Sequence, residues 1–125
     1  MTVLPESIIK AFEDREGPIV FATVASDGKP NIIYATCVSM YENRNIVIAD
    51  NYFDKTKHNI IGKSKVSILF MTKAQQAFQL KGTVEYVAHG TIFDWMKTWN
   101  PSKHPGHGAA VVTIEQAYSG SSVLL

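Results

Sequence analysis

The chain has 125 residues, 46% of them hydrophobic, and a formal net charge of +1, and this length predicts one domain over residues 1–125. Its charges form neither a basic stripe nor an acidic tail, so we expect no nucleic-acid partner. The single cysteine, Cys37, excludes an internal disulfide, and no segment resembles a signal peptide or reaches the ~18 apolar residues of a membrane span, so we expect a soluble cytoplasmic protein without membrane contact.

The first part of the chain predicts a helix and a β-hairpin. Apolar residues recur on one helical face over residues 4–15, and the Gly-Pro pair at 17–18 ends that helix. An apolar, β-branched run over residues 19–25 precedes a Ser-Asp-Gly-Lys turn at 26–29, where glycine accepts a positive φ. A second run over residues 31–40 completes the predicted hairpin.

The rest of the chain predicts four more strands and two helices. We expect strands over residues 46–49, 66–71, 76–87 and 109–117, and helices over residues 53–63 and 91–99. Gly82 interrupts the longest strand and predicts a bulge or a close backbone approach. Hairpins with short connections favour a mainly β fold, a six-stranded antiparallel barrel with a few short helices.

The segment over residues 50–59 carries the strongest chemical signal, because it lies between a predicted strand and a predicted helix. Unpaired N–H groups and the helix dipole favour an anion at a helix start. Lys55 and Lys57 add charge there, Thr56 adds a hydroxyl, and Asn59 follows one turn after Lys55. The segment is a candidate phosphate cradle, and the alternative is a solvated helix start with ordinary surface lysines.

Several short motifs, in their order along the chain, resemble one known family. After the Asp-Gly turn come PNIIYATCVSMY, NIVIAD, KTKHNI, VSILF and FQLKGTVEYV. This order is similar to that of the FMN-binding split-barrel family, which includes pyridoxamine 5′-phosphate oxidase-like proteins and small FMN-binding proteins. The resemblance implies a Greek-key split β-barrel, a homodimer with FMN at the subunit interface, and a phosphate held by Lys55 and Thr56.

The resemblance also implies which residues lie beside the cofactor. The isoalloxazine ring would run along the backbone of four consecutive residues, which are Tyr34, Ala35, Thr36 and Cys37. The ring or the ribityl chain would lie beside the end of the third strand, which carries Ala49, Asp50 and Asn51. The small relatives tend to have glycines near these last positions, whereas this chain has Asp-Asn-Tyr at 50–52. Asp50 would suit a phosphate site only if it points away from the phosphate.

Other residues each have a functional and a structural interpretation. Cys37 is either a flavin-linked thiol or a small core residue. Lys81 either faces solvent or, in the family's geometry, approaches the cofactor. Trp95 and Trp99 share a helical face; they fill the core, or one of them, with Trp99 as the candidate cofactor contact, covers the ring bound by the partner chain.

The histidines at 104 and 107 belong to a loop over residues 101–108 that is rich in proline, glycine and histidine. With His89 or His58 they could suggest a metal site, but no cysteine or carboxylate completes a ligand set, so we expect no metal. A flexible surface loop is the simpler interpretation of this segment.

The function predicted from these features is FMN binding for redox chemistry. No residue pattern indicates a dedicated catalytic acid or base, so electron transfer or a low-specificity flavin reductase activity fits better than a substrate-tailored oxidase. A redox partner protein or NAD(P)H would then supply electrons. The alternatives are a deazaflavin or haem bound by the same fold, and a dimeric interaction module that has lost its cofactor.

Overall fold

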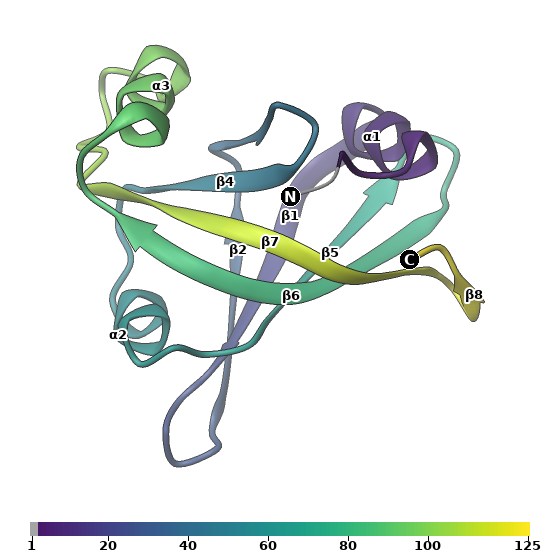
Figure 1. The fold of residues 1–125 in the computed structure, drawn as a ribbon, viewed down its shortest axis with the longest axis horizontal. Coiled ribbons are helices and arrows are strands. Elements are labelled where there is room, and N and C mark those ends of the chain that lie inside the picture. The colour runs from purple at the N-terminus through teal and green to yellow at the C-terminus, as the bar shows by residue number, and fades with distance from the viewer. Residues whose placement is uncertain (1–2) are drawn as a thin grey trace.

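The computed structural model describes residues 3–125, which form three helices and eight strands (Figure 1). The helices are α1 (Glu6–Glu13), α2 (Lys55–Ile61) and α3 (Thr91–Trp99). The strands are β1 (Arg15–Val24), β2 (Pro30–Ala35), β3 (Val38–Tyr41), β4 (Asn45–Asp50), β5 (Val66–Thr72), β6 (Ala77–Val87), β7 (Gly108–Ser119) and β8 (Ser122–Val123). Every pairing between these strands is antiparallel, which confirms the expected mainly β, antiparallel architecture.

The strand order explains why the sheet curls. The strands lie in the order β2-β1-β5-β6-β7-β4-β3, with β8 paired to β7. The two ends of this order, β2 and β3, are consecutive in the chain and are separated only by Thr36 and Cys37. Ala35 and Val38 are three residue steps apart, so their Cα atoms lie at most about 11 Å from each other. The two edges of the sheet must therefore come close together at this point. The result is the split barrel that the sequence predicted.

One predicted strand proves to be two. The apolar run over residues 31–40 divides at Thr36 and Cys37 into β2, which pairs with β1, and β3, which pairs with β4. A continuous β pattern cannot show that its two halves pair with different neighbours. This division and the short C-terminal β8 account for eight strands where six were expected.

Helix α1 packs into the main hydrophobic core of the barrel. Ile8 and Phe12 of this helix are buried in the main hydrophobic cluster. Phe12 meets Phe70 edge-to-face at 5.7 Å between ring centroids, and Phe70 stacks on Phe78 at 5.6 Å. Such aromatic pairs add to the stabilisation that burial alone provides. Within residues 3–125, no helix is long and apolar enough to cross a membrane.

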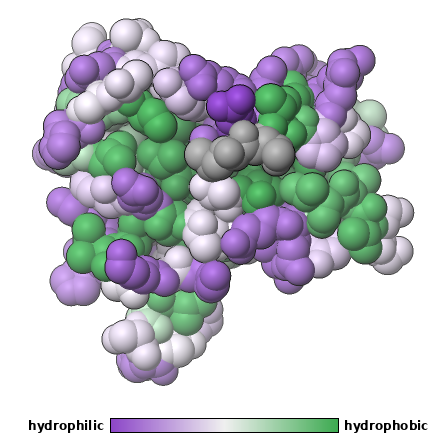
Figure 2. Space-filling view, viewed as in Figure 1, coloured by the Kyte–Doolittle hydropathy of each residue, from purple (hydrophilic) through white to green (hydrophobic). Residues whose placement is uncertain are grey.

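A second, smaller cluster lies between α3 and the sheet. Val47, Ala49, Met96 and Ala109 form its buried centre, and partly buried aromatic residues of α3 pack around them. Figure 2 shows hydrophobic residues at the surface between α3 and the strands beneath it. This cluster fixes α3 and the chain that follows it close to the end of β4.

Gly82 lies at a bulge in the β6–β7 pairing, as the sequence predicted. The register shifts between Lys81 and Gly82, and a Cβ added at Gly82 would overlap the carbonyl oxygen of Thr113. Only glycine permits two backbones to approach this closely. The bulge therefore depends on the absence of a side chain at this position.

Candidate functional site

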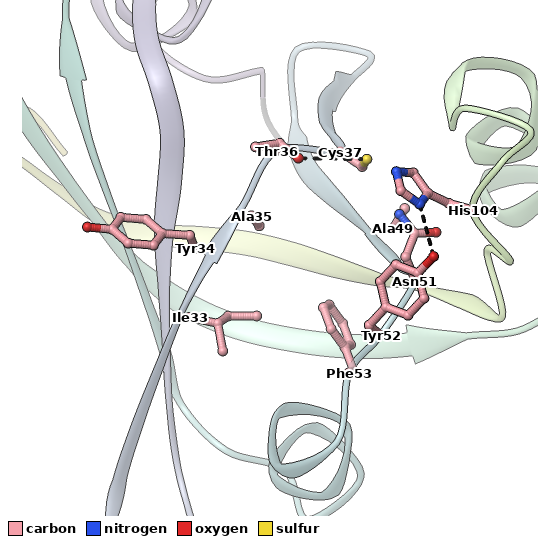
Figure 3. Close-up of a pocket in the computed structure, with 10 residues that line it drawn as sticks. All are labelled: Ile33, Tyr34, Ala35, Thr36, Cys37, Ala49, Asn51, Tyr52, Phe53 and His104. Atoms are coloured by element: carbon pink, nitrogen blue, oxygen red, sulfur yellow. Dashed lines mark hydrogen bonds between the residues drawn. The ribbon is translucent and has the colours of Figure 1, made fainter.

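A pocket of about 240 Å³ lies where the chain passes from β2 to β3 (Figure 3). It is lined by residues of β2, the β2–β3 link, the end of β4, the following turn and the loop after α3. These residues are Ile33, Tyr34, Ala35, Thr36, Cys37, Ala49, Asn51, Tyr52, Phe53 and His104. Of the residues that the sequence suggested, the structure brings together Tyr34, Ala35, Thr36, Cys37, Ala49 and Asn51.

The wall of the pocket is apolar because of strand alternation. Along β2, Ile33 and Ala35 turn inward, while Ile32 and Tyr34 are 69% and 77% exposed. The backbone N–H of Ala49 donates to the carbonyl of Cys37 at 3.0 Å and so holds the β2–β3 link against the end of β4. Two alanines therefore face one hollow from two non-consecutive strands.

Asp50 is buried beside the pocket but does not line it. One carboxylate oxygen accepts a hydrogen bond from the backbone N–H of Phe53 at 2.9 Å, and the other accepts from the Tyr86 hydroxyl at 2.6 Å. Burial, this hydrogen bond and the charge of Asp50 raise the pKa of Tyr86 well above its ordinary value. Asp50 thus shapes the turn that follows β4 and offers no free negative charge to the pocket.

Gly108 makes room for this pair. A Cβ on Gly108 would overlap the hydroxyl of Tyr86. Gly108 pairs with Asp50 across the β4–β7 ladder. Because Gly108 has no side chain, the Tyr86 phenol can pass beside its backbone and reach the Asp50 carboxylate. The short hydrogen bond between Tyr86 and Asp50 therefore depends on glycine at position 108.

Asn51 lines the pocket through a side chain whose polar atoms are engaged. It forms two amide hydrogen bonds with Asn100, at 3.1 and 2.8 Å, and accepts a third from the backbone N–H of Gly106 at 3.0 Å. Both asparagines are only 8% exposed. This buried pair attaches the loop after α3 to the end of β4.

Tyr52 and His104 lie together at the rim of the pocket (Figure 3). The Tyr52 hydroxyl and Nδ1 of His104 are 3.2 Å apart, and the two rings meet edge-to-face with centroids 5.6 Å apart. Sequence reasoning did not bring these two residues together, since 52 positions separate them. The only signal was the cluster of histidines in a loop rich in proline and glycine.

Thr56 and Asn59 are residues of α2 whose buried side chains form a polar cluster with Thr23 and Asn31. Asn31 donates to the Thr56 hydroxyl at 3.0 Å, and Asn59 donates to the Thr23 hydroxyl at 2.9 Å. Thr56 is 2% exposed and Asn59 is 8% exposed. The hydrogen bonds of these two side chains attach α2 to the β1–β2 hairpin.

Lys55 is the first residue of α2 and is exposed. No acidic side chain within residues 3–125 lies in ion-pair distance of it. Asp54 occupies the N-cap position, but its side chain makes no capping hydrogen bond. A second hollow of about 370 Å³, lined by Asp54, Lys57, His58 and Ile61, shares Phe53 with the main pocket. Basic side chains therefore lie beside the hollow that adjoins the apolar pocket.

Lys81 and Trp99 do not line the pocket of their own chain. Lys81 is exposed on β6, with its ammonium 5.6 Å from the centre of the Tyr118 ring. Trp99 packs edge-to-face on Trp95, which packs in turn on Tyr41. The Trp99 indole nitrogen is buried and has no hydrogen-bond partner within residues 3–125. Within one chain, both tryptophans are part of the cluster under α3.

Comparison with known proteins extends over almost the whole chain. Residues 6–119 match the family model described as pyridoxamine 5′-phosphate oxidase. An uncharacterized protein of Methanocaldococcus jannaschii is 31% identical over 123 residues, which cover 93% of this chain and 80% of that protein.

Solved structures share the fold at low sequence identity. HupZ of Group A Streptococcus has a TM-score of 0.84 at 17% identity, over 98% of this chain and 99% of its own. An FMN-binding protein from Syntrophomonas wolfei has a TM-score of 0.66 at 21% identity, over 90% and 82%. An F420 reductase has a TM-score of 0.65 at 15% identity, over 84% and 91%. The solved structures show that the fold is shared, and the match over residues 6–119 shows that the chain belongs to the pyridoxamine 5′-phosphate oxidase family.

Proposed function

We propose that the chain binds FMN in the pocket beside Ala35 and Ala49 and acts as a redox protein. The observation that carries this proposal is the pocket itself. Residues that the family resemblance placed along a flavin ring, from Tyr34 to Cys37 and at Ala49, line one hollow although they come from separate strands. Family membership and the FMN-binding protein of the same fold support the same ligand.

The lining of the pocket suits a planar heterocyclic ring. Ile33, Ala35, Ala49 and Phe53 provide an apolar surface, and the two alanines leave space for a flat group. Polar groups at the rim, from Tyr52 and His104, would meet the polar edge of such a ring. Binding sites for cofactors commonly combine an apolar surface with a few oriented polar groups.

The phosphate of FMN would be held by Lys55, with Lys57 and His58 nearby. Among the residues that the structure describes, Lys55 has no acidic partner, so its charge is available to an anion. The hollow that adjoins the pocket at Phe53 is lined by Lys57 and His58. Thr56 would contribute to this site chiefly by anchoring α2, because its hydroxyl is buried and bonded to Asn31.

We further propose that two copies of the chain form a homodimer at the pocket. The outer face of β2, β1 and β5 exposes Ile32, Tyr34, Leu69 and Met71. In register, Tyr34 lies opposite Val20, and Val20 lies opposite Leu69, so these side chains form one row across three strands. Apolar faces of this kind mark association surfaces. Tyr34 belongs to both the face and the pocket, so a second copy on this face would reach the bound ring.

FMN would supply the electron uptake and release, and the protein would hold the ring and exclude water from it. The donor would be a redox partner protein or NAD(P)H. A deazaflavin is the second candidate ligand, because an F420 reductase shares the fold. Both ligands are planar tricyclic rings that carry a phosphate-bearing chain, and the apolar wall of the pocket suits either.

The proposal is tested by titrating the purified protein with FMN, riboflavin, F420 and haem. The expected result is saturable binding of FMN. Binding is measured by the change in flavin fluorescence and by the visible absorption spectrum. Tighter binding of F420 than of FMN would favour the second candidate. Failure of the protein to bind any of the four ligands would contradict the proposal and favour a cofactor-free interaction module.

A further inference from the structure

The loop after α3 is fixed to the body of the protein by buried hydrogen bonds. We call residues 100–107 the strap. At its start Asn100 forms the two amide bonds with Asn51, and near its end Gly106 donates to the same Asn51 side chain. The backbone N–H of His107 donates to the carbonyl of Asp50 at 2.9 Å. Its composition predicted a flexible loop, whereas the strap is bound at both ends to the last residue of β4 and to Asn51, which follows it.

A lysine of α3 holds the strap from the other side. The Lys97 ammonium donates to the carbonyls of Pro105 and Gly106 at 2.9 and 3.2 Å. Gly106 has a φ of +53°, and a Cβ there would lie 2.9 Å from the Lys97 ammonium nitrogen. This conformation and this contact both favour glycine. These contacts with α3 and with the end of β4 therefore fix the position of the strap on the protein.

The position of His104 follows from the way in which the strap is fixed. It is the one residue of the strap that lines the pocket. Tyr52 engages its Nδ1, and within residues 3–125 its Nε2 has no hydrogen-bond partner. When the Tyr52 hydroxyl donates to Nδ1, the proton of the neutral imidazole lies on Nε2, which then becomes a donor. Figure 3 shows His104 and Tyr52 together at one side of the pocket and Ile33 and Tyr34 at the other.

Other polar side chains of the pocket are engaged elsewhere or point away from it: the Tyr34 hydroxyl lies on the side away from the other lining residues (Figure 3). The Asn51 amide is engaged by Asn100 and Gly106. The Thr36 hydroxyl lies 4.0 Å from the Cys37 sulfur. The imidazole of His104 is thus the best-placed group for a polar contact with a ring seated on the apolar wall.

We propose that the strap makes His104 a ring-recognition residue and that Tyr52 is its positioning residue. Nε2 of His104 would hydrogen-bond a polar atom at the edge of the planar heterocycle that occupies the pocket, while Tyr52 holds the imidazole in the required tautomer and orientation. This inference rests on the proposed function and adds to it the residue that recognises the ring, independently of the phosphate.

The alternative role for the Tyr52–His104 pair is a surface contact that only closes the strap. The two roles differ in their consequences for ligands. A ring contact affects riboflavin and FMN by the same factor, because both ligands carry the same ring. A surface contact changes stability and leaves the affinity for both flavins unchanged.

The test measures the dissociation constants of riboflavin and FMN for His104→Ala, His104→Gln, Tyr52→Phe and the control His107→Ala. The control removes the other histidine of the strap, whose exposed side chain does not line the pocket. We expect His104→Ala to raise both constants by about three- to tenfold, the effect of one net hydrogen bond. We expect His104→Gln to recover part of this loss, because its amide nitrogen reaches near the position of Nε2.

Tyr52 is tested in the ligand-free protein, by the imidazole ¹⁵N chemical shifts of the four histidines. We expect Tyr52→Phe to shift the signals of His104 and to leave those of His58, His89 and His107 unchanged. Unchanged His104 signals would overturn the positioning role of Tyr52.

The binding results separate this inference from the function on which it rests. If the wild-type protein binds both flavins and the folded His104 variants bind them equally well, the ring-recognition role is wrong and the proposed function stands. If the wild-type protein binds neither flavin, both fail. If His104→Ala loses cooperative thermal unfolding, His104→Leu takes its place, because leucine fills a similar volume and has no hydrogen-bonding group. Unchanged affinity of folded His104→Leu for both flavins would overturn the inference.

Discussion

The Tyr86 hydroxyl donates a 2.6 Å hydrogen bond to the Asp50 carboxylate, which is buried at the end of β4. The same carboxylate accepts from the backbone N–H of Phe53. One side chain of β6 therefore orients the acidic residue that defines the turn from β4 toward α2. The pocket residues Asn51, Tyr52 and Phe53 all lie in this turn, so the geometry of the pocket depends on a bond outside it.

Replacing Asp50 is therefore expected to destabilise the protein. Asp50→Ala leaves the Phe53 N–H and the Tyr86 hydroxyl without their charged acceptor. A hydrogen bond to a charged group contributes roughly 1.5–3 kcal/mol, so we expect the free energy of unfolding to fall by about 3 kcal/mol. Urea denaturation measures the change. The control is Asp27→Ala, in an exposed turn, and an equal loss in the two variants would contradict the role of Asp50.

The raised pKa of Tyr86 predicts that the free energy of unfolding falls at alkaline pH. Its pKa is raised in the folded protein, first by burial and then by the hydrogen bond and charge of Asp50. Above pH ~10 the unfolded chain loses the phenol proton while the folded protein keeps it, so the free energy of unfolding falls as pH rises. Urea denaturation at several pH values across this range should show a steeper decline in the wild-type protein than in Tyr86→Phe. Parallel declines would show that Tyr86 does not contribute.

Lys55 is expected to distinguish FMN from riboflavin. A charge-assisted hydrogen bond to phosphate contributes roughly 1.5–3 kcal/mol, so Lys55→Ala should weaken FMN binding by about ten- to a hundredfold. Riboflavin has no phosphate, and its affinity should not change. Fluorescence titration measures both ligands. Lys73→Ala, at an exposed lysine between β5 and β6, is the matched control, and an equal effect of Lys55→Ala on both flavins would reject the phosphate role.

The dimer is tested on the outer face of β2. Ile32 is 69% exposed in the single chain, and a charge there would have to be buried if a second copy packs on this face. Ile32→Glu should convert the dimer to a folded monomer, and sedimentation velocity measures this change in mass. Val123→Glu is the control, because Val123 is 70% exposed at the C-terminal strand. A wild-type protein that sediments as a monomer would disprove the dimer itself.

The tryptophans test whether the partner chain covers the ring. A tryptophan close to a flavin quenches its fluorescence, so Trp95→Phe or Trp99→Phe should raise the emission of bound FMN if one of them lies over the ring. Both tryptophans belong to α3 and pack against the smaller hydrophobic cluster of their own chain, and Phe preserves most of that packing. Emission that stays unchanged in both variants, with FMN fully bound, would assign the cover to other residues such as Tyr52 and Phe53.

The sequence by itself determined the local elements and much of the apolar wall. Alternation of apolar residues and turn chemistry predicted the β1–β2 hairpin, the long β6 with its bulge at Gly82, and α3 over residues 91–99. These features depend on neighbours in the chain, which a sequence pattern records directly. The family resemblance then placed Ala35, Cys37 and Ala49 together, and the structure brings them to one pocket.

Tertiary structure alone decided how distant segments meet. The run over residues 31–40 is two strands because its halves pair with β1 and with β4, and no local propensity specifies a pairing partner. Asp50 points to Tyr86, and Thr56 turns into a buried cluster, because partners 36 and 25 residues away satisfy them. His104 reaches the pocket for the same reason. Its loop has a flexible composition, but buried bonds to Asn51 from Asn100 and Gly106 fix it, and such long-range polar contacts leave no periodic signal in the chain.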